Sequence, residues 1–174
     1  MARWILVVVV LLVAGCSAVP SVPTHLQNAK AVIQESGGPF SATYSGSYSL
    51  RGCTSPDGDG SFKYFGVGSG SFIRKSTESG SLIGDVHQSC KWSGKTTLTS
   101  KFHPQNTITM GLSLNGFQLG TPCAPRFAQK VMFNVLSGTG RFANATGSGT
   151  VKFTCSNSNG NGTYSDQWSG TISF

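Results

Sequence analysis

Apolar and polar residues alternate with a period of two along most of the chain. In residues 40–50, for example, Phe40, Ala42, Tyr44 and their successors at even positions alternate with serine and threonine. Strict alternation is typical of β-strands that have one buried and one wet face. The pattern predicts eight strands, near residues 40–51, 61–74, 79–90, 93–102, 106–119, 127–137, 148–155 and 163–174. It shows no convincing helical period after residue 38.

Evenly spaced strands with glycine-rich turns predict an all-β domain, either a closed barrel or a sandwich. The chain has 23 glycines, and several, such as Gly66, Gly68 and Gly70, lie within predicted strands. Glycine inside a strand often marks a bend or a barrel corner. We therefore expect residues 39–174 to form an eight-stranded antiparallel up-and-down barrel of the calycin type.

The N-terminus has the pattern of a secretory signal. Arg3 supplies one positive charge, and an unbroken apolar run follows from Ile5 to Ala14. A helix that spans a membrane needs about 20 apolar residues, so this run is too short to remain in the bilayer as one. We expect residues 1–15 to be a signal peptide that is removed.

The segment from Leu12 to Cys16 resembles the lipobox of bacterial lipoproteins. The resemblance implies cleavage before Cys16, a diacylglyceryl group on its thiol, and an acyl chain such as palmitate on the new amino terminus. Ser17, in place of aspartate, implies an outer-membrane anchor facing the periplasm in two-membraned bacteria, and otherwise the outer face of the plasma membrane. The alternative is an ordinary signal peptide with an incidental cysteine.

Residues 16–38 contain two prolines and end in a pair of glycines, so they are predicted to be a tether. A short helix fits within residues 24–35, where Thr24 is a plausible N-cap. A flexible tether of about 20 residues has a mean reach of roughly 25 Å.

The formal net charge is +7, but the positive residues are scattered, and Arg74-Lys75 is the longest run of them. Nucleic-acid binding needs clustered charge, so it is not expected. Attraction to anionic lipid headgroups or to polysaccharide stays open, and so does the oligomeric state.

Apart from Cys16, the chain has an even number of cysteines, which in an exported domain predicts two disulfides. All of them follow odd-numbered predicted strands, so in an up-and-down barrel they meet at one end. Neighbouring strands favour the pairs Cys53–Cys90 and Cys123–Cys155, with Cys53–Cys155 as the alternative. Their spacing fits no metal site, and no metal or cofactor is predicted.

The most distinctive run extends from Gly138 to Thr150, GTGRFANATGSGT. It resembles the late hairpin of allene-oxide-cyclase-like barrels, a superfamily that includes the plant dirigent proteins. The resemblance implies an eight-stranded barrel with an apolar, lipocalin-like interior. The run also matches a dinucleotide fingerprint, but that motif needs a helix at its glycines, and turn and strand residues follow here. We interpret it as a structural hairpin built by Gly138, Gly140, Arg141, Phe142 and Gly147.

No catalytic set of that superfamily can be placed on this chain. Carboxylates are scarce after the tether, namely Asp57, Asp59, Glu78, Asp85 and Asp166. Asp85 and His87 are two residues apart on one predicted strand, so they share a face, and with His103 they are weak candidates for a polar catalytic cluster. The alternative is that all three are ordinary surface residues.

These observations favour a membrane-anchored, non-catalytic barrel that binds a small apolar or amphipathic molecule or a partner at the cell envelope. One alternative is a cyclase- or isomerase-like enzyme, which would need a carboxylate that points into the barrel and has a raised pKa. Another is a purely structural envelope protein, which an interior packed solid would favour.

Overall fold

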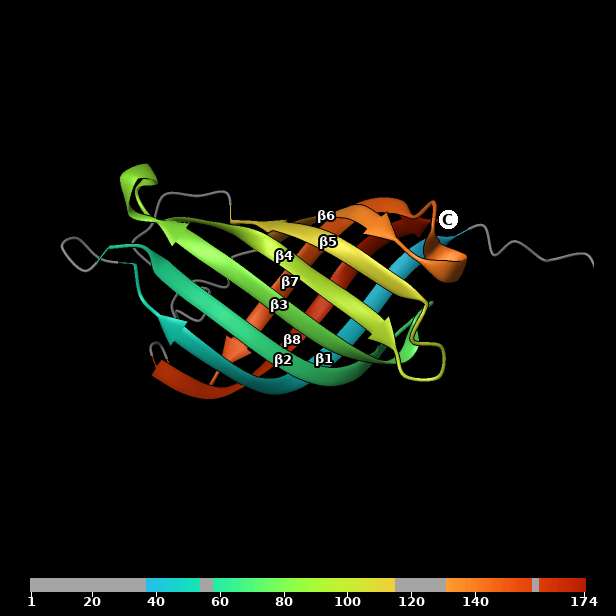
Figure 1. Cartoon of the computed structure of the whole chain (residues 1–174), viewed down its shortest axis with the longest axis horizontal. Coiled ribbons are helices and arrows are strands. Elements are labelled where there is room, and N and C mark those ends of the chain that lie inside the picture. Colours follow the sequence, from blue (N-terminus) through green and yellow to red (C-terminus); the bar gives the residue numbers. More distant parts are fainter. Residues whose placement is uncertain (1–36, 54–57, 115–130, 158–159) are drawn as a thin grey trace, which may run out of the picture. The chain divides into compact units, whose positions relative to one another are not determined.

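The computed structural model describes residues 37–53, 58–114, 131–157 and 160–174, and it confirms the predicted all-β barrel (Figure 1). Each strand pairs antiparallel with the next along the chain, and β1 pairs with β8 to close the ring. The strands are β1 (Gly38–Arg51), β2 (Gly60–Gly70), β3 (Arg74–Asp85), β4 (Lys91–Ser100), β5 (Thr107–Ser113), β6 (Val131–Gly138), β7 (Thr146–Cys155) and β8 (Gly160–Ser173). Among the described residues there is no helix long and apolar enough to cross a membrane.

The connections between strands alternate between the two ends of the barrel. We call one end the cysteine rim. It carries the connections after β1, β3, β5 and β7, including the 3₁₀ turn η1 (Val86–Gln88). The other end is the hairpin rim, which carries residues 71–73, 101–106 and 139–145. Gly38 opposite Ile172 places the start of β1 and the end of β8 at the hairpin rim as well.

The predicted bridge between Cys53 and Cys90 is confirmed. The two cysteines are buried at the cysteine rim, and their Cα atoms are 5.7 Å apart. Cys155 ends β7 at the same rim. Cys123, its predicted partner, lies outside the described residues, so that bridge stays a prediction.

We expect peptide mapping of the unreduced protein to recover a Cys123–Cys155 cross-linked peptide together with the Cys53–Cys90 one. The reason is that β6 and β7 are neighbours, and Val131 at the start of β6 lies opposite Val151, four residues before Cys155 at the end of β7. A peptide that joins Cys53 to Cys155 would contradict both pairings.

The third strand runs from 74 to 85, not from 79 to 90 as the sequence pattern predicts, and β2 ends at Gly70. The alternation is interrupted at residues 71–73, where Ile73 turns inward. The inward positions that follow are held by Ser76 and Glu78. Because these inward residues are polar, β3 does not show the alternation of apolar and polar residues by which the other strands are predicted.

The inside of the barrel is filled by side chains in contact with one another. Towards the cysteine rim, the Phe62 ring contacts Tyr48 and Phe153, with both centroid distances 5.5 Å. Towards the hairpin rim, the Phe133 ring lies 6.1 Å from Phe40 and 5.2 Å from Trp168. Rings of this size dominate the burial of apolar surface.

Glycines at inward positions make room for these rings. A Cβ atom on Gly80 would lie 2.1 Å from Cζ of Tyr64, and one on Gly84 would lie 2.7 Å from Cε2 of Trp92. The glycine-rich strands are therefore paired with bulky neighbours across the sheet. The distinctive hairpin is part of the same packing, because η2 (Gly140–Phe142) places the fully buried Phe142 ring 4.9 Å from the ring of Phe174.

We expect Gly80→Ala to destabilise the barrel by about 1–3 kcal/mol, the usual cost of overpacking a core. Combining it with Tyr64→Leu should recover part of the loss, because the side chain that clashes is then shorter. Urea unfolding of the two single variants and the double variant gives the coupling between the two positions. The outward-facing Ser79→Ala is the control, and strictly additive effects of the two changes would contradict the proposed clash.

Candidate functional site

Two carboxyl side chains project into the centre of the barrel. Asp166 on β8 shares its phase with the inward residues Tyr164 and Trp168, and Glu78 on β3 shares its phase with Ser76. Glu78 is 0% exposed and Asp166 is 1% exposed. A buried charge is costly unless it is paired or hydrogen-bonded, so these acids need a physical explanation.

Hydrogen bonds from β8 and β1 hold the two carboxyl groups. The Tyr164 hydroxyl donates to Oε2 of Glu78 at 2.8 Å. The backbone N–H of Tyr44 on β1 donates to Oδ1 of Asp166 at 3.0 Å. The hydroxyls of Tyr44 and Ser76 share a hydrogen bond of 2.7 Å beside them. The result is a polar cluster between the two aromatic layers.

Burial raises the pKa of both acids. For Glu78 the pKa lies well above its usual value, first because of burial and then because of the negative charge of Asp166. Burial raises the pKa of Asp166 to about 6, against the lowering effect of the neighbouring Glu78 carboxyl, the Trp168 indole and the hydrogen bond from the Tyr44 backbone. At neutral pH we infer a protonated Glu78 that donates a hydrogen bond to an ionised Asp166.

Shared protonation also accounts for two of the four buried polar atoms that have no hydrogen-bond partner among the described residues. These atoms are Oε1 of Glu78, Oδ2 of Asp166, Oη of Tyr64 and Nε1 of Trp168. A proton between the two carboxyls satisfies the first two atoms. A void large enough for a water molecule would leave accessible surface on the atoms that line it. The side chains around the pair are almost fully buried, so the pair has no such void beside it.

The chemistry of such a pair is that of an acid beside a base. Two carboxyls in different environments can hold and release a proton near neutral pH, which is also the arrangement used for acid–base catalysis. In this barrel the pair is enclosed by buried aromatic rings, which include Phe62, Tyr64 and Trp168.

The structure separates His103 from Asp85 and His87, the three residues that the sequence offered as a weak catalytic cluster. Asp85 lies at the cysteine rim, where its Oδ1 accepts a hydrogen bond from the His87 backbone N–H at 2.9 Å and its Oδ2 accepts one from Gln88 at 2.7 Å. His103 lies in the connection between β4 and β5, at the hairpin rim. Asp85 thus caps a 3₁₀ turn, and the three do not meet.

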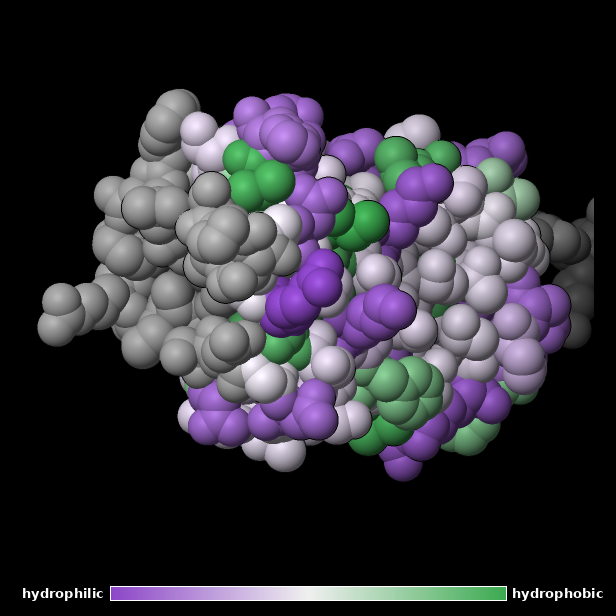
Figure 2. Space-filling model, turned by 60° about the vertical axis from the view of Figure 1, so that its left-hand side comes forward, coloured by the Kyte–Doolittle hydropathy of each residue, from purple (hydrophilic) through white to green (hydrophobic). Residues whose placement is uncertain are grey.

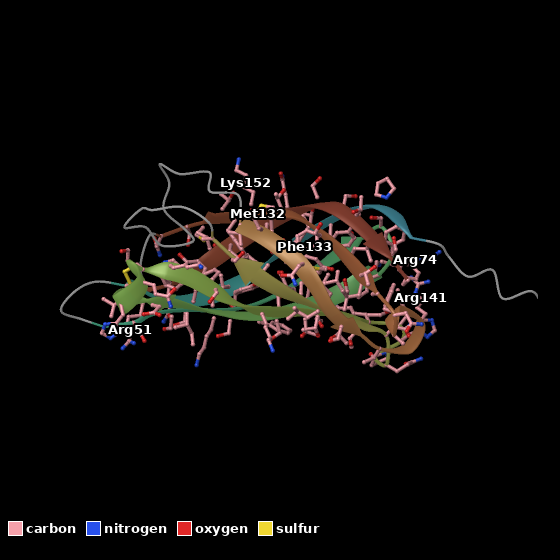
Figure 3. All side chains as sticks on the ribbon, turned by 90° about the horizontal axis from the view of Figure 1, so that it is seen from above. Arg51, Arg74, Met132, Phe133, Arg141 and Lys152 are labelled. Carbon is pink, nitrogen blue, oxygen red and sulfur yellow. A yellow bond between two sulfur atoms is a disulfide. The ribbon has the colours of Figure 1, made fainter. Side chains whose placement is uncertain are left out.

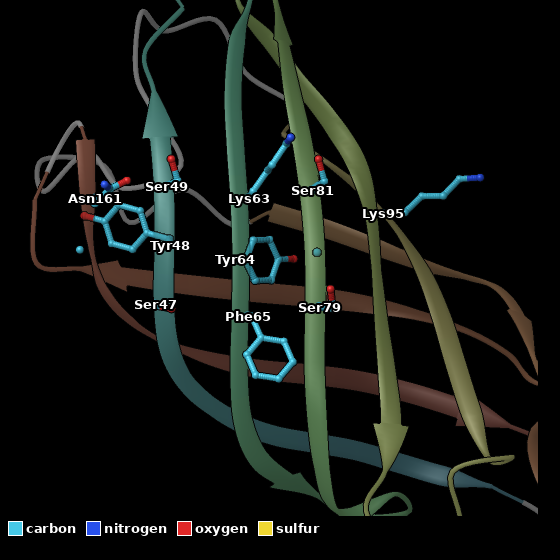
Figure 4. Close-up of a pocket in the computed structure, with 12 residues that line it drawn as sticks. Ser47, Tyr48, Ser49, Lys63, Tyr64, Phe65, Ser79, Ser81, Lys95 and Asn161 are labelled. Carbon is cyan, nitrogen blue, oxygen red and sulfur yellow. The ribbon is translucent and has the colours of Figure 1, made fainter.

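A second candidate site lies on the outside of the barrel, over β8, β1, β2, β3 and β4. It is an open groove of about 750 Å³ (Figure 4). Its lining is rich in hydroxyl groups and carries two cations, an amide and an exposed ring: Ser47, Ser49, Lys63, Phe65, Ser79, Ser81, Lys95 and Asn161. Tyr48, Tyr64, Gly80 and Gly162 complete the groove. Acidic side chains are absent from this lining.

The ring of Phe65 is 54% exposed, so it is available for contact. Val67, which is 46% exposed, lies two residues further along the same face of β2, whereas Ile83 lies opposite Ser61 on β2. Figure 2 shows exposed apolar residues as separate patches among polar ones. The wall of the barrel is therefore mainly polar.

Comparisons of the chain with protein-family models, with curated proteins and with solved structures gave no match. The resemblance of the late hairpin to allene-oxide-cyclase-like barrels therefore stays a prediction. Within the described ranges, no group of three His, Cys, Asp or Glu side chains lies close enough to hold a metal ion.

Sequence reasoning counted Glu78 and Asp166 among the scarce acids but did not place them inside the barrel. For Asp166 a signal was present, because Tyr164, Trp168 and Ile172 define the apolar phase of that strand and Asp166 falls on it. For Glu78 the neighbouring inward residues are serine and glycine, so the phase is not visible.

The pair makes stability depend on pH. The folded chain binds the Asp166 proton more tightly than the unfolded chain does, so this contribution is complete below about pH 4 and is lost as pH rises through about 6. A rise of about two pKa units corresponds to roughly 3 kcal/mol. We expect Asp166→Asn to lose this part of the decrease in unfolding free energy between pH 4 and pH 8 and to keep the part that comes from Glu78, whose pKa is also raised.

Urea unfolding at several pH values measures the effect. The control is Asp85→Asn at the cysteine rim, which keeps an oxygen that can accept the hydrogen bond from the His87 N–H. We expect its unfolding free energy to vary with pH as that of the parent does. If Asp166→Asn and the parent lose stability equally over this range, Asp166 is not the group that binds the proton.

Proposed function

We propose that the protein is a lipid-anchored binding module of the bacterial envelope that holds its partner on the outside of the barrel, in the groove over β1–β4. The anchor is the lipidated Cys16. The barrel would then face the periplasm from the outer membrane, or the exterior from a single plasma membrane. The observation that carries the choice of surface is the contrast between a filled interior and an open outer groove.

The filled interior argues against a small apolar ligand inside the barrel. Leu82, Leu98, Ile108 and Met110, which lie at inward positions on three strands, are all 0% exposed. A ligand the size of a fatty acid would have to displace several rings from their contacts. Packed cores resist insertion of even one extra methylene group.

The groove suits a polar chain that carries negative charge. Lys63 and Lys95 supply positive charge from β2 and β4. The serines of β3 supply donors and acceptors between them, and those of β1 do so on the other side of Lys63. The exposed ring of Phe65 offers a flat apolar face to one side of a sugar. We therefore propose an anionic glycan as the partner, bound through charge and hydroxyl contacts.

One observation favours an enzyme as a second candidate. The buried pair of Glu78 and Asp166 points inward and has raised pKa values, which is the arrangement an acid–base isomerase would use. A substrate would need an opening through the aromatic layers. This candidate therefore requires a motion that exposes the pair.

The test of the groove is binding of a soluble anionic polysaccharide, polygalacturonate, followed by calorimetry, with uncharged dextran as the comparison. Polygalacturonate should bind, and binding should weaken as salt is added, because surface charges are screened. We expect Lys63→Gln with Lys95→Gln to weaken binding by about tenfold, at roughly 0.5–1 kcal/mol for each exposed charge.

Lys152→Gln, on the outer face of β7 and away from the groove (Figure 3), is the matched control and should bind as the parent does. Equal binding of dextran and polygalacturonate would show that charge is not recognised. If the protein retained an apolar dye and a competing apolar ligand displaced it, the result would favour a ligand inside the barrel over the groove.

A further inference from the structure

We propose that the hairpin rim is a second binding surface, which docks on the anionic phosphate headgroups of the membrane that holds the anchor. The proposal rests on the lipid anchor of the proposed function, but it concerns a different face of the barrel from the groove. It assigns the orientation of the barrel on the membrane.

The chain enters the barrel at this rim. Residues 16–38 lead from the lipidated Cys16 into β1, and β1 begins at Gly38 on the hairpin rim. The cysteine rim lies at the far ends of the strands (Figure 1). An anchor on the same chain raises the effective concentration of headgroups at the end it enters.

Among the residues that the structure describes, charge is distributed unequally between the two rims. Arg74, Lys75, Lys101 and Arg141 lie at the hairpin rim together with His103, and all five side chains are exposed. The described part of this rim has no side-chain carboxylate. At the cysteine rim, by contrast, Arg51 and Lys91 are accompanied by Asp59 and Asp85. One end of the barrel is therefore cationic, although the sequence spreads its positive residues widely.

Arg74 and Arg141 line a cleft of about 510 Å³, together with Ile73, Ser100, Phe102, His103, Asn106 and Phe142. The hairpin motif is fixed at its edge, because the backbone N–H of Arg141 donates to Oδ1 of Asn106 at 3.2 Å. The guanidinium of Arg141 donates to the Phe72 carbonyl and lies 4.7 Å from the ring of Phe142. Arg74 and Arg141 occupy the same end of the barrel (Figure 3).

One further feature favours a lipid headgroup over a soluble anion, and another brings charge to the rim. Phe102 is 65% exposed beside the cleft, and aromatic rings are favourable at the boundary between headgroups and acyl chains. Arg74 has a φ of 55°, in the left-handed region that suits glycine better than a long side chain. An arginine at this strained position brings a charge to the rim.

The strain supplies a clean test. Arg74→Gly removes the charge and at the same time relieves the backbone, so the fold should be kept. Lys101→Gln removes a second charge from an exposed loop. Lys152→Gln removes a charge of the same kind from the barrel wall and is the control (Figure 3).

The full lipidated chain is reconstituted in nanodiscs of phosphatidylcholine alone, or of phosphatidylcholine with phosphatidylglycerol. Hydrogen exchange is followed in residues 101–106 and 139–145. We expect exchange to be slower with phosphatidylglycerol and the difference to vanish at about 0.5 M salt. Each neutralised charge should weaken the association about fivefold, so Arg74→Gly and Lys101→Gln should reduce the slowing while Lys152→Gln keeps it.

Equal exchange in the two kinds of nanodisc would overturn the proposal. Protection by soluble glycerophosphoglycerol or inorganic phosphate, without protection by phosphatidylglycerol, would also overturn it and would assign the cleft to a soluble anion.

Mass spectrometry tests the lipid anchor separately: a spectrum in which Cys16 carries no lipid would show that the predicted anchor is wrong. In that case the same unlipidated chain is sedimented with vesicles of either lipid composition. Binding to phosphatidylglycerol vesicles that depends on Arg74 and Lys101 would support the docking surface alone. Absence of such binding would overturn it.

Discussion

An eight-stranded barrel has an interior just wide enough to be filled by side chains, and this fixed width governs the rest of the structure. The pairing of β1 with β8 closes the sheet and leaves no free edge. Because the width of the closed barrel is fixed, a large side chain inside must lie opposite a small one. The pairs Gly80–Tyr64 and Gly84–Trp92 follow from that limit. The glycines are needed here for the space they leave across the sheet.

The same limit explains the state of the two buried acids. A barrel with a wide interior would have admitted water around Glu78 and Asp166, and both could then have been ionised. In this filled interior the acids depend on each other, on Tyr164 and on the Tyr44 backbone. The pair therefore binds a proton more tightly than the unfolded chain does, and the folded state loses stability as the pH rises and that proton is released.

With the centre occupied, the surfaces of the barrel are left to carry recognition. The wall over β1–β4 presents hydroxyl groups, two lysines and one ring, and the hairpin rim presents arginines and lysines near the start of β1. The two surfaces have different geometries, one a long open groove and the other a cleft at an end. An anchored barrel can use the end for the membrane and the wall for a partner.

The sequence by itself determined the number of strands and their antiparallel order, because alternation with a period of two is a local property. It favoured the Cys53–Cys90 bridge over Cys53–Cys155, and the structure decided between them. It placed β3 wrongly, since Ser76 and Glu78 are polar residues on a buried face.

Only the tertiary structure brought Glu78 on β3 together with Asp166 on β8, and separated His103 from Asp85 and His87. Closure sets these distances, and residues 86 positions apart in the chain, such as Glu78 and Tyr164, become hydrogen-bonded only when the ring is complete. The clustering of charge at the hairpin rim has the same origin. Arg74, Lys101 and Arg141 are far apart along the chain, and alternate connections of an up-and-down barrel place them at one end.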